Sequence, residues 1–442
     1  MDNETPKTPR PAEALKKAAR AAAPNHRDPT RLRRARRGAS ADTLTPMMKA
    51  IKAVHSATSS TSLAPEDLAR QRAAQELFGR MVSPAVGLRT DSLTVRHGPE
   101  PVPAEWVSQE AGHDRRHVVL YCHGGGYTCG QLGYARVLAG KLALSTGCDV
   151  LSFEYRLAPE HPYPAALQDA LSVWDYMAYM GYGARDILVA GDSAGGNLAL
   201  ELALKLKEQG RRQPRALILM SPWTDLTASG ESYTQRAELD PMLTMDYVES
   251  VRAAFCGPRT DFDAPALSPL FADLRGLPPT LIQVGTNEIL YSDSERLHGA
   301  MQAQNVFSTL EVYPDCWHVF QQMPTRHAAQ AMDSVGRFVQ RVLWGVSEKS
   351  PALSNSTKKQ RLLRCSTLEY IKYSCGFAPC IRRFLANFPA LLIYQIHPKP
   401  AFPHSERRPP CRIPGTRWTM WPTCSWLRSP AGTPGSSGSA AP

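Results

Sequence analysis

The chain has 442 residues and a formal net charge of +11, and this charge is unevenly distributed. Residues 1–40 hold 11 basic and four acidic side chains, and residues 351–442 hold 13 basic and two acidic ones. The stretch between them is therefore mildly acidic, so the basic balance does not indicate a nucleic-acid partner for the body of the protein. The length favours one large domain with appendages, or two domains.

Cysteine usage and hydropathy narrow the class of protein further. The ten cysteines have no regular spacing, which favours reduced thiols in a cytoplasmic protein over a disulfide framework. Cys375 and Cys380 lack the neighbouring ligands that a zinc site needs, so we expect no metal. The longest apolar run, Phe384 to Ile396, contains Pro389 and is shorter than the roughly 18 to 20 residues of a membrane span. We expect no signal peptide and no membrane span.

The first elements in chain order are a leader and a helical cap. Residues 1–40 are rich in Pro, Ala, Lys and Arg and contain almost no large apolar residues, which predicts a disordered basic leader. Apolar residues then recur at helical spacing between Asp42 and Met81, first around Met47 to Val54 and again after Ala64-Pro65-Glu66. Two short amphipathic helices are expected there, forming part of a cap.

A long alternation of strands and helices follows and predicts an α/β fold with a mostly parallel sheet covered on both faces. The expected strands are Val118–Cys122, Val150–Phe153, Ile187–Ala190, Ala216–Met220, Thr280–Val284 and Thr309–Tyr313. The expected helices are Tyr163–Met180, Gly195–Glu208, Ser292–Ala303 and Arg326–Leu343. The long connection from Trp223 to Pro278 has helical pieces and should complete the cap. One domain over residues 41–349 results, followed by a mostly disordered Pro/Arg/Ser-rich tail over 350–442.

A candidate nucleophile lies between the third of these strands and the helix after it. The segment Gly191–Gly196 reads Gly-Asp-Ser-Ala-Gly-Gly. A strand, a sharp turn and a helix form the context of a nucleophile elbow, in which small neighbours allow the strained turn at the serine. The sequence therefore predicts Ser193 as a catalytic nucleophile.

A glycine-rich segment comes directly after the first predicted strand. His123–Tyr127 reads His-Gly-Gly-Gly-Tyr, and glycines leave backbone N–H groups accessible. Such a loop can direct the N–H groups of Gly125 and Gly126 at a developing oxyanion, with another from Ala194. The spacing differs from phosphate-binding glycine motifs, so phosphate binding is not expected.

Both motifs, together with Tyr155–Pro162, Ser221–Leu226 and Trp317–Phe320, resemble those of the hormone-sensitive-lipase-like esterases. The resemblance covers roughly residues 90 to 345 and, within the family, is greatest to acetyl-hydrolases and ε-lactone hydrolases. It implies the α/β-hydrolase fold, and it implies that His123 shapes the oxyanion loop and is not the base.

The catalytic base and acid should follow the last two strands. His318 comes after Thr309–Tyr313, which is the position of the base in this fold. The resemblance aligns Glu288 with the acid, whereas an alternative register would place Asn287 there, and Asp293 is a third candidate. An Asn in place of the acid can select the wrong imidazole tautomer.

These residues together predict a serine carboxylic-ester hydrolase, similar to lipases, that acts on short-chain acyl esters or lactones without a cofactor. Its triad would be Ser193, His318 and Glu288. Two alternatives remain open on the sequence: an amidase, and a non-catalytic protein that binds a small molecule on the same scaffold. Monomeric and homodimeric states also remain open.

Overall fold

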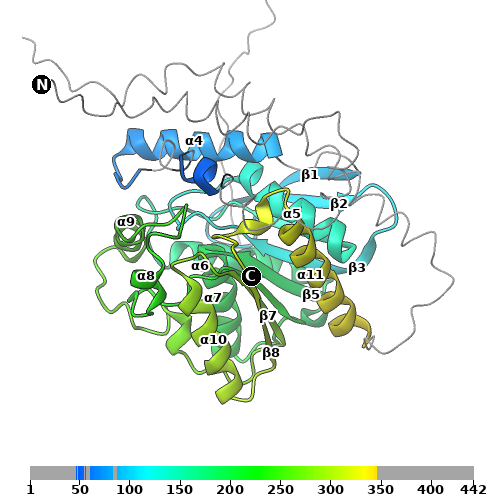
Figure 1. Ribbon diagram of the computed structural model, residues 1–442. Coiled ribbons are helices and arrows are strands. Elements are labelled where there is room, and N and C mark those ends of the chain that lie inside the picture. Colours follow the sequence, from blue (N-terminus) through cyan, green and yellow to red (C-terminus); the bar gives the residue numbers. More distant parts are fainter. Residues whose placement is uncertain (1–45, 47, 54, 56–59, 83–86, 346–442) are drawn as a thin grey trace, which may run out of the picture. The chain divides into compact units, whose positions relative to one another are not determined.

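The computed structural model describes residues 46, 48–53, 55, 60–82 and 87–345. The predicted leader over residues 1–40 and the predicted tail over 350–442 lie outside these residues. The central element is an eight-stranded sheet with the order β1-β2-β4-β3-β5-β6-β7-β8 (Figure 1). The strands are β1 (Leu88–Val95), β2 (Val102–Gln109), β3 (Asp114–Cys122), β4 (Cys148–Phe153), β5 (Ile187–Asp192), β6 (Leu217–Met220), β7 (Thr280–Gly285) and β8 (Ser308–Tyr313).

The sheet is parallel from β4 to β8, and each of the six expected strands is present with ends shifted by at most a few residues. β1 and β2 were not predicted. They form an antiparallel pair, and β2 joins the rest of the sheet by pairing antiparallel with β4. The prediction of an α/β fold with a mostly parallel sheet is confirmed.

Helices cover both faces of the sheet, because successive side chains along each buried strand point to opposite faces. Along β3, Val118, Leu120 and Cys122 belong to one hydrophobic cluster, whereas Val119 and Tyr121 belong to a second one. The first cluster also holds side chains of α6 (Ala165–Tyr179), α7 (Ala194–Glu208) and α10 (Tyr291–Ala303). The second holds those of α5 (Leu132–Thr146) and α11 (Arg326–Trp344).

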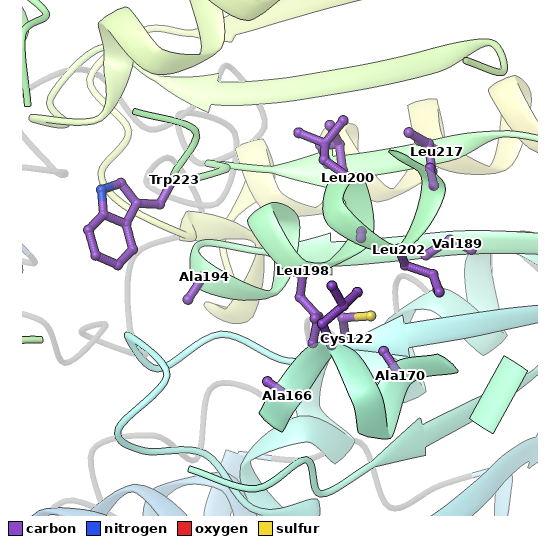
Figure 2. Packing of buried hydrophobic residues seen from close by; sticks show 14 of the residues in the cluster. Cys122, Ala166, Ala170, Val189, Ala194, Leu198, Leu200, Leu202, Leu217 and Trp223 are labelled. Atoms are coloured by element: carbon purple, nitrogen blue, oxygen red, sulfur yellow. The ribbon is translucent and has the colours of Figure 1, made fainter. Parts of the chain in front are cut away.

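The helix that follows the candidate nucleophile is packed tightly into the first cluster. Figure 2 shows Leu198 and Leu202 of α7 close to Ala170 of α6 and to Cys122 and Val189 of the sheet. Burying a leucine side chain stabilises the fold by roughly 1.5 to 3 kcal/mol. The packing therefore fixes the first turn of α7, where the chemistry is expected.

The predicted cap consists of two segments of the chain. One is the helical stretch near residues 48–53 together with α4 (Pro65–Val82). The other lies between β6 and β7 and contains α8 (Ser232–Gln235) and α9 (Met245–Cys256). The hydroxyl of Ser250 on α9 donates a hydrogen bond to the carbonyl oxygen of Thr61 at 2.7 Å, which joins the two segments.

Candidate active site

The turn between β5 and α7 holds Ser193 in a strained conformation. Its φ is 54° and its ψ is −122°, a region that residues with a Cβ seldom adopt. A Cβ on Gly191 would lie 2.1 Å from the carbonyl oxygen of Gly195, and one on Gly195 would lie 2.1 Å from that of Cys122. Only glycine at both positions allows the strand and the helix to approach this closely.

Three side chains from separate loops form a continuous chain of hydrogen bonds. The Ser193 hydroxyl lies 2.9 Å from Nε2 of His318, and Nδ1 of His318 lies 3.1 Å from Oε2 of Glu288. Ser193 follows β5, Glu288 follows β7, and His318 follows β8, so the carboxyl ends of parallel strands bring them together. All three are buried.

The second carboxylate oxygen of Glu288 also has hydrogen-bond partners. Oε1 accepts hydrogen bonds from the Gly285 N–H at 2.5 Å and from the Ser221 hydroxyl at 2.9 Å. The same Ser221 oxygen accepts the N–H of Val319 at 3.1 Å. One hydroxyl therefore links the loop that carries the carboxylate to the loop that carries His318, and both carboxylate oxygens have fixed partners.

The two other candidates for the acid point elsewhere. The Asn287 side-chain nitrogen lies 3.7 Å from the sulfur of Met48. One carboxylate oxygen of Asp293 accepts the N–H groups of Thr224 and Asp225 at 2.7 and 2.9 Å. Of the three, Glu288 is the one in contact with His318.

The glycine-rich loop is held against the turn at Ser193 by a buried carboxylate. Oδ1 of Asp192 accepts the Gly124 N–H at 2.9 Å and also the hydroxyl of Tyr121. Gly125 and Gly126 line the same pocket as Ser193. Ala194 is the first residue of α7, so its N–H has no partner within the helix. This arrangement offers backbone donors beside the serine.

His123 has a structural place beneath this loop. Its ring stacks on that of Tyr155 with 4.1 Å between the ring centroids. The Tyr155 hydroxyl donates to the His123 carbonyl oxygen at 2.8 Å. Burial lowers the pKa of His123 to about 4, so its imidazole is neutral at neutral pH.

The electrostatic environment favours the protonated form of His318. Burial alone lowers the pKa of this imidazole, but the hydrogen bond and the negative charge of Glu288 outweigh burial, with smaller contributions from Asp240 and Asp192. The net result is a pKa raised above 6.5. A base that gains a proton during a reaction is stabilised by such surroundings.

A pocket opens in front of Ser193 and His318. Its walls are largely apolar and come from both cap segments and from loops of the sheet; they include Trp223, Leu243, Val248, Val251 and Leu290. A nucleophile, a base with an orienting carboxylate, nearby backbone donors and an apolar pocket are the components that acyl transfer requires.

Comparison with known proteins gives the family. A family described as having the alpha/beta hydrolase fold matches residues 119–322. An esterase of Acinetobacter venetianus is 37% identical over 223 residues, which are 50% of this chain and 74% of that protein. An acetyl-hydrolase of Streptomyces hygroscopicus is 37% identical over 257 residues, 58% of this chain and 82% of that protein.

A solved structure agrees with these relatives. The crystal structure of an esterase from the bacterial hormone-sensitive lipase family superposes with a TM-score of 0.63 at 34% identity, covering 69% of this chain and 99% of that one. The chain belongs to the hormone-sensitive-lipase-like esterase family. It is a carboxylic ester hydrolase on an α/β-hydrolase scaffold.

Several residues of this esterase site were not predicted from the sequence. Ser221 was noted as part of a family motif, but its hydroxyl bridge to Glu288 has no signal in the sequence. His55 and Tyr247 line the pocket and come from cap segments for which only helices were predicted.

Among the described residues, no group of three or more His, Cys, Asp or Glu side chains could hold a metal ion. No helix in the described part of the chain is both long and apolar enough to cross a bilayer.

Proposed function

We propose that this esterase hydrolyses short-chain acyl esters or lactones through a triad of Ser193, His318 and Glu288. The observation that carries the proposal is the unbroken chain of hydrogen bonds from the Ser193 hydroxyl through His318 to Glu288. The strained φ of Ser193 supports it further, because strain is retained where a side chain must be presented to a substrate.

In this proposal Ser193 Oγ attacks the carbonyl carbon while Nε2 of His318 takes the hydroxyl proton. The N–H groups of Gly125, Gly126 and Ala194 stabilise the negative charge that develops on the carbonyl oxygen. His318 then gives its proton to the departing alcohol, and a water molecule, activated by the same imidazole, releases the acid. Glu288 keeps the proton of neutral His318 on Nδ1, so that Nε2 can accept.

The lining of the pocket supports an acyl ester as substrate, because apolar side chains such as Trp223, Leu243 and Val248 surround the space beside Ser193. The similarity to a protein named acetyl-hydrolase supports the same class of substrate.

The test is hydrolysis of p-nitrophenyl butyrate by the wild type and by Ser193→Ala. We expect the variant to lose at least about 10³-fold in kcat while it keeps its circular dichroism spectrum, because the serine supplies the nucleophile. A fluorophosphonate should label the wild type at Ser193 only. Equal turnover by the variant would refute the proposed mechanism.

A further inference from the structure

Three side chains of the cap segment between β6 and β7 form hydrogen bonds with the Glu288 loop, residues 286–290. They belong to Ser232, Arg236 and Asp240, which are spaced four residues apart. The Arg236 N–H donates to the carbonyl oxygen of Ser232 and the Asp240 N–H to that of Arg236, both at 3.0 Å. These are hydrogen bonds of the helical type, so the three side chains lie on one side of the segment.

The residue directly after Glu288 is bonded through both of its backbone polar groups. The N–H of Ile289 donates to Oδ2 of Asp240 at 2.9 Å, and its carbonyl oxygen accepts the hydroxyl of Ser232 at 2.5 Å. The same Ser232 oxygen accepts the N–H of Ser292 at 2.9 Å. Ser232, Asp240 and Ile289 are buried. Hydrogen bonds in such a place are electrostatically stronger than in water, and they fix the backbone next to Glu288.

Arg236 contacts the Glu288 loop at its start and the residue just after its end. Its guanidinium donates to the carbonyl oxygen of Thr286, two residues before Glu288. It also lies over the ring of Tyr291, 3.9 Å from the ring centroid, which is the geometry of a cation–π contact. Contacts from the cap segment are therefore present on both sides of Glu288 along the chain.

The Glu288 loop is also bonded to the segment before His318. The N–H of Asn287 donates to the carbonyl oxygen of Cys316 at 2.8 Å. The Thr286 hydroxyl oxygen accepts the N–H of Asp315 at 2.8 Å. The loop thus has two sets of partners, and the cap segment supplies one of them.

Asp240 connects the Glu288 loop with the wall of the pocket. Its Oδ1 accepts the N–H groups of Met242 and Leu243 at 2.8 and 2.9 Å, while Oδ2 accepts that of Ile289. Met242 and Leu243 line the pocket in front of Ser193. A single carboxylate therefore joins the part of the cap that faces the pocket to the loop that carries Glu288.

We propose that Ser232, Arg236 and Asp240 are positioning residues, which hold Glu288 where it orients His318. This inference rests on the proposed function. A displacement of about 1 Å in an active site can reduce the rate on the order of 10²-fold. Loss of one of these contacts should therefore lower kcat, although Ser232 and Arg236 are not among the residues that line the pocket at Ser193.

The experiment measures kcat and KM of the full chain for p-nitrophenyl butyrate. Ser232→Ala should lower kcat at least about fivefold and leave KM within about twofold. Ser268→Ala is the matched control, because Ser268 is buried in the same connection between β6 and β7. Its hydroxyl donates to the carbonyl oxygen of Phe262 at 2.5 Å and accepts the N–H of Leu226 at 2.8 Å. Both variants should lose similar stability in urea, but Ser268→Ala should keep kcat within about twofold.

A double-mutant cycle determines whether the effect passes through Glu288. In the Glu288→Gln background, Ser232→Ala should lower the residual kcat less than about twofold, because the carboxylate whose position it fixes is absent. Arg236→Met keeps most of the aliphatic stem and should give the same pattern, and it replaces Ser232→Ala in the cycle if that variant does not fold. Asp240 stays unchanged in this test, because its negative charge also acts on His318 directly.

The outcomes separate the two proposals. If Glu288→Gln lowers kcat but Ser232→Ala and Arg236→Met do not, this inference is wrong and the proposed function stands. If Glu288→Gln leaves kcat unchanged, the proposed triad and this inference both fail. Equal losses of kcat from Ser232→Ala and Ser268→Ala would overturn the positioning role. An equal loss from Ser232→Ala with and without the Glu288 carboxylate would also overturn it.

Discussion

At the scale of single residues, the hydrogen bonds of Glu288 determine what each substitution does. Oε1 accepts two donors, Gly285 N–H and the Ser221 hydroxyl, so a glutamine here keeps its carbonyl oxygen on that side. Its NH₂ group would then face Nδ1 of His318. An imidazole that accepts at Nδ1 carries its proton on Nε2 and cannot take the proton of Ser193.

The first prediction follows from this tautomer. Glu288→Gln should lower kcat for p-nitrophenyl butyrate by a factor on the order of 10³ to 10⁴ with little change in KM. Asn287→Ala is the control and should have little effect, because its side chain faces Met48. If Asn287→Ala were the damaging change, Glu288 would not be the acid.

Substitution of Asp293 should affect the stability of the fold more than the catalytic rate. Its carboxylate accepts the N–H groups of Thr224 and Asp225 in a buried position. Asp293→Ala would leave two buried donors without an acceptor, at a cost of about 1 to 3 kcal/mol each. We expect this variant to unfold at lower urea concentration than the wild type, and any loss of kcat to be far smaller than that of Glu288→Gln.

The second prediction concerns the acid limb of the pH profile. His318 acts as a base only when neutral, so kcat/KM falls as the pH drops through its pKa, which Glu288 raises above 6.5. Removing this negative charge leaves burial as the main influence, and burial lowers the pKa. The acid limb of the residual activity of Glu288→Gln should therefore lie at lower pH than that of the wild type. A limb that stays in place would show that another group titrates there.

The position of a single residue in the site could be predicted where a motif follows a recognisable strand. Ser193 and His318 follow strands that the apolar pattern locates, and the structure brings them within hydrogen-bonding distance. Whether Glu288 or Asn287 occupies the position of the acid depends on how this segment is aligned, and the two alignments differ by a shift of one residue. The family resemblance was needed to choose Glu288. Ser221 could not be found as a partner of Glu288, since its contact depends on how two loops from distant strands meet.

At the scale of elements, α5, β1 and β2 were missed for identifiable reasons. α5 is buried on most sides, so its apolar residues form no single stripe from which a helical period could be read. β1 is an edge strand with mostly exposed polar residues. β2 contains Pro103 and a buried Glu105, whose carboxylate pairs with Arg136 at 2.6 Å, and neither residue is typical of a strand.

α5 also forms hydrogen bonds with the loop that carries His318. The buried Nζ of Lys141 donates to the carbonyl oxygens of Gln321 and Met323, which follow His318 closely. The Gln322 side chain donates to the hydroxyl of Tyr134, also on α5, at 2.6 Å. A helix that the sequence did not reveal therefore helps to hold the loop of His318 in place.

The third prediction tests this contact. Lys141→Met should lower the free energy of unfolding by about 2 to 5 kcal/mol, because two buried carbonyl oxygens lose their donor. Lys205→Met on α7 is the matched control; its ion pair with Glu208 is exposed and should contribute at most about 1 kcal/mol. Urea denaturation followed by tryptophan fluorescence measures both. Equal stability of the two variants would contradict the role of Lys141.

At the scale of the whole molecule, charge and composition predict where the catalytic domain begins and ends, but they do not predict which residues form the N-terminal wall of its pocket. The described residues fall within the predicted domain over 41–349. A helical cap was predicted before the sheet. A cavity next to the active site is lined by Lys52, His55 and Ser60. Its lining depends on how this segment packs against α9, and short-range sequence patterns do not encode this packing.

The fourth prediction compares two shortened chains. Residues 41–349 alone should hydrolyse p-nitrophenyl butyrate within about twofold of the full chain, because the described contacts of the sheet and of Ser193, His318 and Glu288 join residues inside this range. Residues 63–349 lack His55, which lines the pocket in front of Ser193, and should hydrolyse this ester more slowly than residues 41–349. Kinetics on p-nitrophenyl butyrate and thermal unfolding measure these effects. Loss of activity in the longer chain would show that the outer segments contribute to the site.

The bridge formed by Ser221 also bears on how the proposed triad can change during evolution. Many esterases could in principle exchange glutamate and aspartate as the acid, but here Glu288 reaches His318 with one oxygen while Gly285 and Ser221 hold the other. An aspartate is one methylene shorter and cannot keep all three contacts from the same backbone position. A lineage that moves from this triad to an aspartate triad must therefore shift the loop as well as the side chain. We therefore expect the single substitution Glu288→Asp to lower kcat, and a second change in the loop to be needed to restore it.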